Sequence, residues 1–199
     1  MNAKGAFICI EGLDGSGKTT QARLLADRLR KDNETFFTAE PSAGKTGTFL
    51  RECCLYEKCR LPTAAEALLF SADRIEHLEN EIKPALSSGK VVVCDRYLHS
   101  SLAYQGSAGV DLDWIAKINS YALTPDLSVF IDVPPERVLE RLRRRKSVME
   151  TLEIQRKVRD VYLRYVQKGE LVLVDGDKSR EEVAKTLYSK IIDFLKARS

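Results

Sequence analysis

The sequence predicts a three-layer α/β fold, in which a five-stranded, mostly parallel sheet is flanked by helices. The first observation behind this prediction is an alternation of short apolar runs and amphipathic helical patterns along all 199 residues. The second is that most apolar runs are continuous, as expected of parallel strands covered on both faces. The third is a glycine-rich loop between the first apolar run and the first helical pattern. Together they favour one sheet with helices on both sides.

The expected elements follow in chain order. Strands are predicted at 6–11, 35–38, 91–94, 127–131 and 171–174. Helices are predicted at 17–31, 45–58, 63–87, 111–122, 135–145, 149–167 and 179–197. No internal repeat, low-complexity segment or linker interrupts the series. We therefore expect residues 1–199 to form a single domain.

Composition restricts the class of protein. The chain carries 32 Lys and Arg residues against 29 Asp and Glu residues, and the formal charge of +3 is too mild to predict nucleic-acid binding. No apolar run approaches the roughly 18 residues of a membrane helix, and the N-terminus carries no signal-like segment. We expect a soluble, cytoplasmic protein without a nucleic-acid or membrane partner.

Five cysteines stand at positions 9, 53, 54, 59 and 94. An odd number without a secretory signal predicts reduced thiols. Cys9 and Cys94 lie in apolar, strand-like runs and are expected to be core residues. Cys53, Cys54 and Cys59 lack C-x-x-C spacing, so a zinc site is not favoured there.

The glycine-rich loop fits the phosphate-binding motif G-x-x-x-x-G-K-[ST]. The motif and the residue after it are Gly12, Leu13, Asp14, Gly15, Ser16, Gly17, Lys18, Thr19 and Thr20. Its glycines permit backbone angles that aim N–H groups at an anion, and the following helix offers its positive N-terminal end to the same anion. We expect Lys18 to reach the β- and γ-phosphates and the Thr19 hydroxyl to ligate Mg²⁺. The sequence thus predicts a P-loop NTPase fold that binds ATP with Mg²⁺.

Polar residues also follow the other predicted strands. In a parallel sheet such residues meet beyond the carboxyl ends of the strands, where ligands bind. Glu40 opens a turn-rich loop after the second strand, and Asp95 and Arg96 follow the third. Asp95 is the candidate for holding Mg²⁺, although a helix-capping or salt-bridged role is the alternative. Asp132, which two prolines follow, is expected to have a structural role.

Several motifs, taken together, resemble the thymidylate kinase family. They are Phe7–Gln21, Glu40–Pro41, Leu69–Arg74, Asp95–Tyr97 with Ser100–Ser101, Ala103–Gly106, and Pro125–Leu127 leading to Asp132–Glu136. The matches come in order and span residues 7 to about 165. The resemblance implies ATP-dependent phosphorylation of dTMP to dTDP by a Mg²⁺-assisted in-line transfer. It also implies a homodimer.

The resemblance assigns three residues to the base of dTMP. Phe70 is expected to stack on thymine, Arg74 to hydrogen-bond a base carbonyl, and Ser101 to contact the base edge. Gln105 is expected to belong to the substrate site as well. Phe70 and Arg74 are four apart in a helical pattern, so they share a face. The alternative for Phe70 is an ordinary core residue.

The resemblance also assigns the phosphate and the sugar. Arg96 is expected to bind the acceptor phosphate, with Arg51 as a second donor and Glu40 at the mouth of the site. Tyr104 is expected to pack under the sugar, where a 2′-hydroxyl would otherwise lie. The alternatives are a core role for Tyr104 and a solvated helix charge for Arg51.

A basic segment at 141–147 is interpreted as part of a mobile lid at about 141–151. The resemblance implies that Arg143 and Arg145 close over ATP and stabilise charge at the γ-phosphate, acting with Lys18, Arg96 and Asp95. No general base is needed, because a nucleoside monophosphate carries close to two negative charges at neutral pH. The alternative is a basic, solvated helix.

Other functions remain open at this point. A deoxynucleoside kinase would share the fold but would need a carboxylate base, a role that Glu40 could fill. A kinase of another nucleoside monophosphate would share the P-loop and the lid. A regulatory GTPase should carry an N-K-x-D motif, which the sequence lacks. A nucleic-acid-binding ATPase would need a stronger basic field than +3 supplies.

Overall fold

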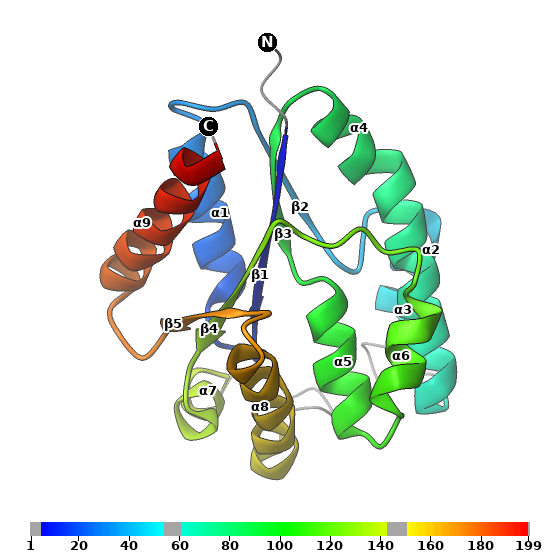
Figure 1. Cartoon of the computed structure of the whole chain (residues 1–199). Coiled ribbons are helices and arrows are strands. Elements are labelled where there is room, and N and C mark those ends of the chain that lie inside the picture. The colour runs from blue at the N-terminus through cyan, green and yellow to red at the C-terminus, as the bar shows by residue number, and fades with distance from the viewer. Residues whose placement is uncertain (1–4, 54–60, 143–150, 199) are drawn as a thin grey trace.

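A five-stranded parallel sheet forms the centre of the protein (Figure 1). The computed structural model describes residues 5–53, 61–142 and 151–198. The strands are β1 (Ala6–Gly12), β2 (Thr35–Ala39), β3 (Val91–Asp95), β4 (Leu127–Asp132) and β5 (Val172–Asp175), in the order β2-β3-β1-β4-β5. Every neighbouring pair is parallel, so the predicted fold class is confirmed and the sheet is parallel throughout.

Each strand ends one residue later than the sequence predicted. Parallel pairing continues one residue past each predicted end, and in β3, β4 and β5 that residue is an aspartate. Ile10 pairs with Asp95, and Asp132 pairs with Asp175. The backbone hydrogen bonds of the ladder therefore hold these carboxylates at the edge where the strands end.

The helices fill both sides of this sheet (Figure 1). They are α1 (Lys18–Leu29), α2 (Lys45–Cys53), α3 (Thr63–His77), the π-helical turn η1 (Leu78–Ile82), α4 (Lys83–Ser87), α5 (Leu98–Ser107), α6 (Leu112–Ile118), α7 (Pro135–Arg141), α8 (Leu152–Gln167) and α9 (Arg180–Arg198). The helix predicted at 63–87 is thus three consecutive segments. Pro84, which lacks an N–H for helical bonding, is the second residue of α4, two positions after the π-helical turn ends.

One helix, α5, was not predicted. Its sequence contains Ser100, Ser101, Gly106 and Ser107, which are weak helix formers and obscure the apolar periodicity. The helix packs against α8 and α6, and this tertiary packing outweighs the weak propensity. The parts of the predicted helices at 54–58 and 143–145 lie outside the described residues.

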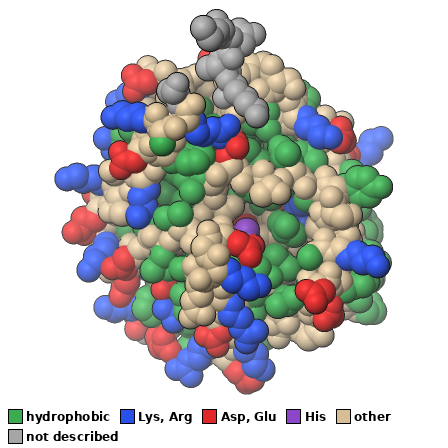
Figure 2. All heavy atoms as spheres, viewed as in Figure 1, with side chains coloured by type: hydrophobic (Ala, Val, Ile, Leu, Met, Phe, Trp, Pro, Cys, Tyr) green, Lys and Arg blue, Asp and Glu red, His purple; other side chains and the backbone are tan. Residues whose placement is uncertain are grey.

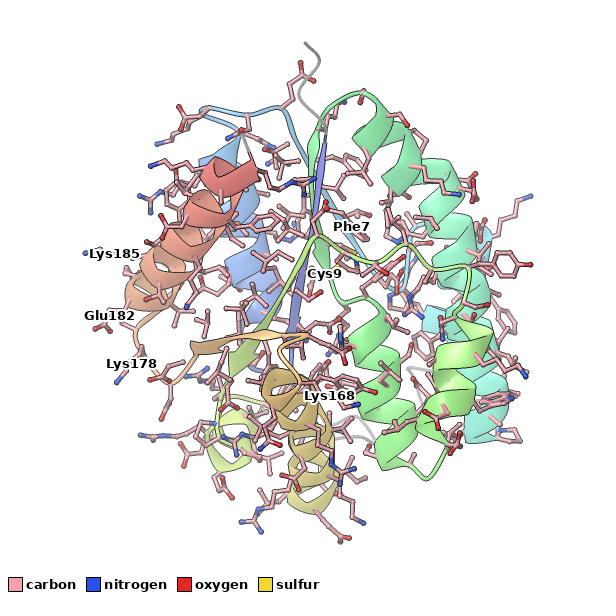
Figure 3. All side chains as sticks on the ribbon, in the orientation of Figure 1. Phe7, Cys9, Lys168, Lys178, Glu182 and Lys185 are labelled. Atoms are coloured by element: carbon pink, nitrogen blue, oxygen red, sulfur yellow. The ribbon has the colours of Figure 1, made fainter. Side chains whose placement is uncertain are left out.

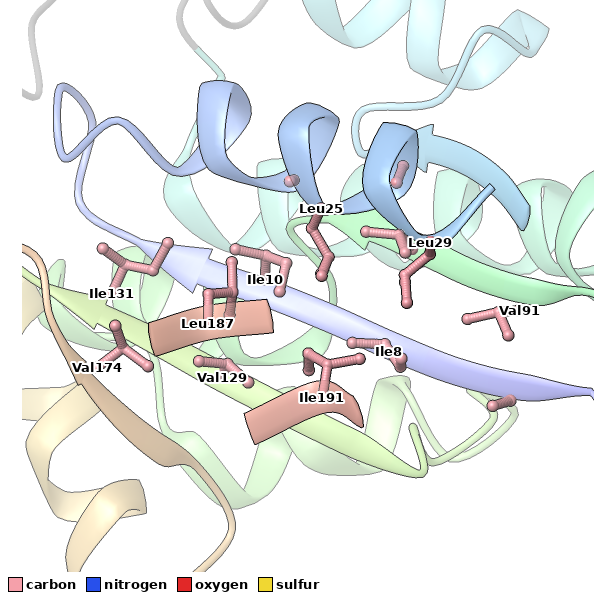
Figure 4. Close-up of a cluster of buried hydrophobic side chains, with 14 of the residues drawn as sticks. Ile8, Ile10, Leu25, Leu29, Val91, Val129, Ile131, Val174, Leu187 and Ile191 are labelled. Carbon is pink, nitrogen blue, oxygen red and sulfur yellow. The ribbon is translucent and has the colours of Figure 1, made fainter. Parts of the chain in front are cut away.

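One face of the sheet packs against α1 and α9 (Figure 4). Alternate residues of β1, Ile8 and Ile10, point to this side, as the two-residue period of a strand requires. They meet Leu25 of α1 and Leu187 and Ile191 of α9. All five side chains are buried, so the sheet and the two helices share one apolar layer.

The opposite face packs against η1, α4, α5 and α8. Phe7 and Cys9 alternate with the residues of the first face, and Figure 3 places them in the interior on β1. Phe7 meets Tyr97 edge to face, with 5.0 Å between ring centroids. Cys9 and Cys94 are buried with free thiols, and burial raises the pKa of both. The predicted core role of these two cysteines is confirmed.

Charged side chains of both signs interleave on the surface seen in Figure 2. Lys178, Glu182 and Lys185 mark the outer side around the start of α9 (Figure 3). Within the described residues, the helices are too short or too polar to cross a bilayer. The order of the strands reverses at β1, between β3 and β4, and ligands of open parallel sheets bind beyond the carboxyl ends at such a point.

Candidate active site

The P-loop connects β1 to α1 at this reversal point. Gly15 and Gly17 have φ values of 85° and 87°, a left-handed conformation that glycine adopts without strain. A Cβ on Gly12 would lie 2.6 Å from Ser16 Oγ, so the loop also requires glycine there for space. Lys18 begins α1, and its Nζ donates to the carbonyl of Leu13 at 3.3 Å. The loop is therefore shaped as a cradle of N–H groups at a helix N-terminus.

Asp14 lies between two cations. Its Oδ1 accepts a hydrogen bond from Arg96 Nη2 at 2.5 Å and lies 3.6 Å from Lys18 Nζ. Burial alone would raise the pKa of Asp14, but Arg96 and Lys18 outweigh it and hold that pKa well below its usual range. A carboxylate thus occupies the position between Lys18 and Arg96, where an anion is best stabilised.

Arg96 is held in a left-handed backbone conformation, with φ at 72°. Such a conformation is unfavourable for a residue other than glycine and is found at functional sites. Its Nη1 donates to Ser100 Oγ at 3.0 Å and to the carbonyl of Gly12 at 3.4 Å. The guanidinium therefore lies against the P-loop.

Tyr104 joins the same cluster from α5. Its hydroxyl accepts from the backbone N–H of Asp14 at 2.9 Å and from Arg96 Nη2 at 3.3 Å. The guanidinium also stands over the ring, 4.9 Å from its centroid. Tyr104 is buried in the apolar cluster of α5 and α8 while its hydroxyl reaches the site. The two predicted roles, core residue and site residue, are therefore compatible.

Asp95 and Thr19 form the candidate metal position. Asp95 is buried, and its Oδ1 has no hydrogen-bond partner among the described residues. The side chain of Thr19 is exposed. Clusters of three His, Cys, Asp or Glu residues suited to a metal do not occur in the described part of the chain. Mg²⁺ is usually held by one or two protein oxygens together with water and substrate phosphates, and this pair fits that pattern.

Arg74 and Glu40 form a buried ion pair. Their side chains are 1% and 3% exposed, and Arg74 Nη2 lies 2.7 Å from Glu40 Oε2. Nη2 also donates to Ser101 Oγ at 3.1 Å, and Nη1 donates to Asn119 Oδ1 at 2.5 Å. Burial alone would lower the pKa of Arg74, but Glu40 outweighs it and the pKa is raised. The Nε of Arg74 has no partner among the described residues.

The loop after Glu40 is fixed by side chains from α2 and α3. Asp73 accepts from the backbone N–H and the hydroxyl of Ser42, at 2.9 and 2.6 Å. Arg51 donates to the carbonyls of Pro41 and Ser42, at 2.7 and 2.6 Å. Glu76 accepts from two backbone N–H groups at the start of α2, and these bonds lower its pKa. Arg51 therefore holds this loop in the structure.

The remaining predicted substrate residues lie on the helices around Arg74. Phe70 is one turn before Arg74 on α3 and is partly buried. Gln105 lies one residue after Tyr104 on α5; it is buried, and its Oε1 has no partner among the described residues.

Asp132 accepts two hydrogen bonds from Arg159, both at 2.7 Å, which agrees with the structural role expected for it. Arg143 and Arg145 lie outside the described residues.

Comparisons with known proteins identify the family. A family model described as thymidylate kinase matches residues 10–187. The chain belongs to the thymidylate kinase family. A "Probable thymidylate kinase" from Pyrococcus horikoshii is 43% identical over 197 residues, which cover 94% of this chain and 96% of the relative. A "Thymidylate kinase" from Halothermothrix orenii is 37% identical over 200 residues, which cover 94% and 97%.

Three residues of this thymidylate kinase family member were missed by sequence reasoning. Glu11 is buried and accepts from Tyr97 N, Ser100 Oγ and Tyr162 Oη, at 2.9, 2.6 and 3.1 Å. A lone carboxylate at the end of an apolar strand was the available signal. His77 was not assigned a role from the sequence, because its contact with Glu40 spans 37 positions. Asn119 follows the last residue of the short helix α6, and an asparagine at a helix end is common enough to give no functional signal.

Proposed function

We propose that the protein transfers the γ-phosphoryl group of ATP to dTMP, giving dTDP and ADP. The observation that carries this proposal is the position of Arg96. Its guanidinium lies against the P-loop, 2.5 Å from Asp14 and 3.4 Å from the carbonyl of Gly12. A donor for a second phosphate therefore stands beside the donors for the first, as transfer between two phosphates requires.

The chemistry is an in-line displacement. A phosphate oxygen of dTMP attacks the γ-phosphorus, the bond to the β,γ-bridging oxygen breaks, and ADP leaves with the electron pair. Lys18 and Arg96 neutralise charge on the equatorial and attacking oxygens. Mg²⁺, when bound near Thr19 and Asp95, supplies further charge neutralisation at the β- and γ-phosphates. The incoming phosphate takes the place of the Asp14 carboxylate as the partner of Lys18 and Arg96.

The acceptor is recognised through its base and its sugar. Phe70 stacks on thymine, and Arg74 donates a hydrogen bond to a base carbonyl, for which its unpartnered Nε–H is available. Ser101 and Gln105 lie on α5 beside them. Tyr104 packs beneath the deoxyribose and is tied by its hydroxyl to the P-loop.

The lid proposal is supported by Arg141, the last residue of α7. Its Nη1 donates to the carbonyl of Ser16 in the P-loop at 3.4 Å, and its Nη2 lies 3.5 Å from the carbonyl of Gly176. Arg141, the first residue of the basic segment, therefore contacts the P-loop. We place Arg143 and Arg145 over the ATP phosphates when the segment closes.

A nucleoside kinase is the alternative that needs Glu40 as a general base. Both oxygens of Glu40 are engaged: Oε2 by Arg74 at 2.7 Å and Oε1 by His77 at 3.3 Å. Both carboxylate oxygens are thus occupied by protein donors, so neither is free to accept a proton from a substrate hydroxyl. This geometry favours the monophosphate acceptor.

The test is a coupled ADP-release assay with dTMP, thymidine, dUMP, UMP, AMP and no acceptor. We expect dTMP to be the best substrate and thymidine to be inactive. Efficient use of thymidine would move the protein to the nucleoside kinases. Equal ADP release with and without an acceptor would mean that the protein is an ATPase and not a kinase.

We further propose that the protein is a homodimer. Phe49 of α2 and Leu68 and Ile75 of α3 are exposed large apolar side chains, and Leu68 and Ile75 are seven apart on one face of α3. Light scattering on the purified protein measures its mass directly, and a monomer at micromolar concentration would overturn this proposal.

A further inference from the structure

His77 ends α3 one turn after Arg74 and is enclosed by polar groups from three directions. Its side chain is 0% exposed. Nδ1 lies 3.3 Å from Glu40 Oε1, and Nε2 lies 2.6 Å from Thr38 Oγ1 of β2. Glu81 of η1 lies 3.5 Å from Nε2 and also accepts from Thr38 Oγ1, at 2.8 Å. The imidazole therefore connects the sheet to the carboxylate of the Arg74–Glu40 pair.

Hydrogen counting fixes the role of Nδ1. The carboxylate of Glu40 is paired with a guanidinium and can only accept, so Nδ1 must carry the hydrogen between them. On the other side, Thr38 has one hydroxyl hydrogen and donates it to Glu81 at 2.8 Å, so its oxygen, 2.6 Å from Nε2, accepts from Nε2–H. In this arrangement each ring nitrogen carries a hydrogen, and Nδ1–H is directed at Glu40 Oε1. His77 therefore holds Oε1 of Glu40.

Glu40 in turn holds Arg74. With Oε1 fixed by His77, Oε2 is directed at Arg74 Nη2, while Asn119 and Ser101 engage the other donors. The guanidinium is thereby fixed in its plane, which leaves Nε–H without a partner among the described residues. Loss of the His77 contact would leave Glu40 free to rotate about its terminal torsion, which is broad for a carboxylate.

We propose that His77 is a positioning residue for base selection: through Glu40 it orients Arg74 so that the site prefers a base with a carbonyl over the same base with an amino group. The inference rests on the proposed function, because Arg74 reads the base there. His77 acts through two other side chains and does not touch the substrate. Its effect should appear in selectivity and in KM rather than in the transfer step.

The test compares dTMP with 5-methyl-dCMP, which keeps the methyl group and the sugar but replaces one base carbonyl by an amino group. His77→Gln places its amide toward Thr38 and removes the donor to Glu40. His77→Asn places an amide nitrogen near the Nδ1 position and keeps that donor. We expect His77→Gln to lower the dTMP to 5-methyl-dCMP ratio of kcat/KM about tenfold, mainly through KM, and His77→Asn to restore most of it.

Two controls isolate this effect. The dTMP to dUMP ratio reports on the methyl group alone and should stay within about twofold in both variants. Glu79→Gln changes an exposed residue of η1 that pairs with Lys83, and it should alter neither ratio. Thermal melting of every variant separates lost folding from lost selectivity.

Each remaining outcome overturns the proposal. An unchanged 5-methyl-dCMP ratio in a folded His77→Gln protein would remove His77 from base selection. Equal losses in the Gln and Asn variants would mean that the Nδ1 donor is irrelevant. If neither variant folds, His77 is a purely structural residue. A wild-type protein that uses dTMP without preferring it over 5-methyl-dCMP defeats this inference, whereas one that does not use dTMP defeats the proposed function.

Discussion

Arg96, at the proposed phosphate end of the site, is paired with one partly exposed carboxylate, whereas Arg74, at the proposed base end, is enclosed by three buried partners. The side chains of Arg96 and Asp14 are 16% and 40% exposed, while those of Arg74 and Glu40 are 1% and 3% exposed. An exposed pair can exchange partners at small cost, but a buried pair cannot. We therefore expect Arg96 to exchange Asp14 for a ligand at the phosphate end, and Arg74 to keep its protein partners at the base end.

The largest effect should come from Lys18→Ala at the phosphate end. This change removes the charge that we propose lies at the γ-phosphate during transfer, and we expect kcat to fall about 10³-fold or more. The fold should persist, because among the described residues Lys18 makes only a 3.3 Å bond to Leu13 and a 3.6 Å contact with Asp14. Turnover within tenfold of wild type, measured by ADP release, would contradict the P-loop assignment.

The two arginines should differ sharply in their effect on stability. Arg74→Ala leaves Glu40 as a buried charge without its guanidinium, and we expect a loss of about 3–5 kcal/mol in the free energy of unfolding. Arg96→Ala leaves Asp14, which water can reach, and should cost under about 1 kcal/mol. Denaturant unfolding measures both variants. Equal losses would remove the distinction between an open and an enclosed pair.

Tyr104 lies where the two ends meet, so its ring and its hydroxyl can be tested separately. If the ring packs under the sugar, a ribonucleotide buries an unpaired hydroxyl at a cost of about 1–3 kcal/mol, or roughly 5- to 150-fold. Tyr104→Ala should weaken this preference for deoxyribose, while Tyr104→Phe, which keeps the ring, should retain it. The measurement is kcat/KM for dTMP and ribothymidine monophosphate. Full preference in the Ala variant would make Tyr104 a core residue only.

The smallest effect should be the pH dependence of the phosphate end. The pKa of Asp14 is lowered in the folded protein, so its contribution to stability is present above its unfolded pKa of about 3.9 and is lost as pH falls through the folded value. The stability difference between wild type and Asp14→Asn should be constant above about pH 5 and should shrink below pH 4. Thermal melting at pH 6, 4 and 3 measures it. A difference that stays constant to pH 3 would contradict the ion pair with Arg96.

Much of the phosphate end was predictable, because it is contiguous in the chain. The P-loop lies within residues 12–20, and two of its glycines, Gly15 and Gly17, carry positive φ values. Asp95 and Arg96 follow an apolar strand that could be recognised by its composition. The five strands were found for the same reason, and their ends were missed by one residue because parallel pairing continues one residue past each predicted end.

The base end was less predictable, because its contacts are long-range. Arg74 meets Glu40, Ser101 and Asn119 across 34, 27 and 45 positions. No periodicity reports such distances, so the resemblance supplied Arg74 but not the partners that fix it. The helix α5, which carries Ser101, was missed because small polar residues hide its apolar face. Its stability comes from packing on α6 and α8, which a local pattern does not contain.

The most direct test of the separation between the two ends is the substrate selectivity of Arg96→Ala. The variant removes the proposed donor to the acceptor phosphate and leaves every described partner of Arg74 in place. We predict that kcat/KM for dTMP falls about 10²-fold or more, while the dTMP to 5-methyl-dCMP ratio stays within twofold of wild type. A large fall in the dTMP to 5-methyl-dCMP ratio together with the fall in kcat/KM would show that phosphate and base recognition are coupled, which contradicts the separation.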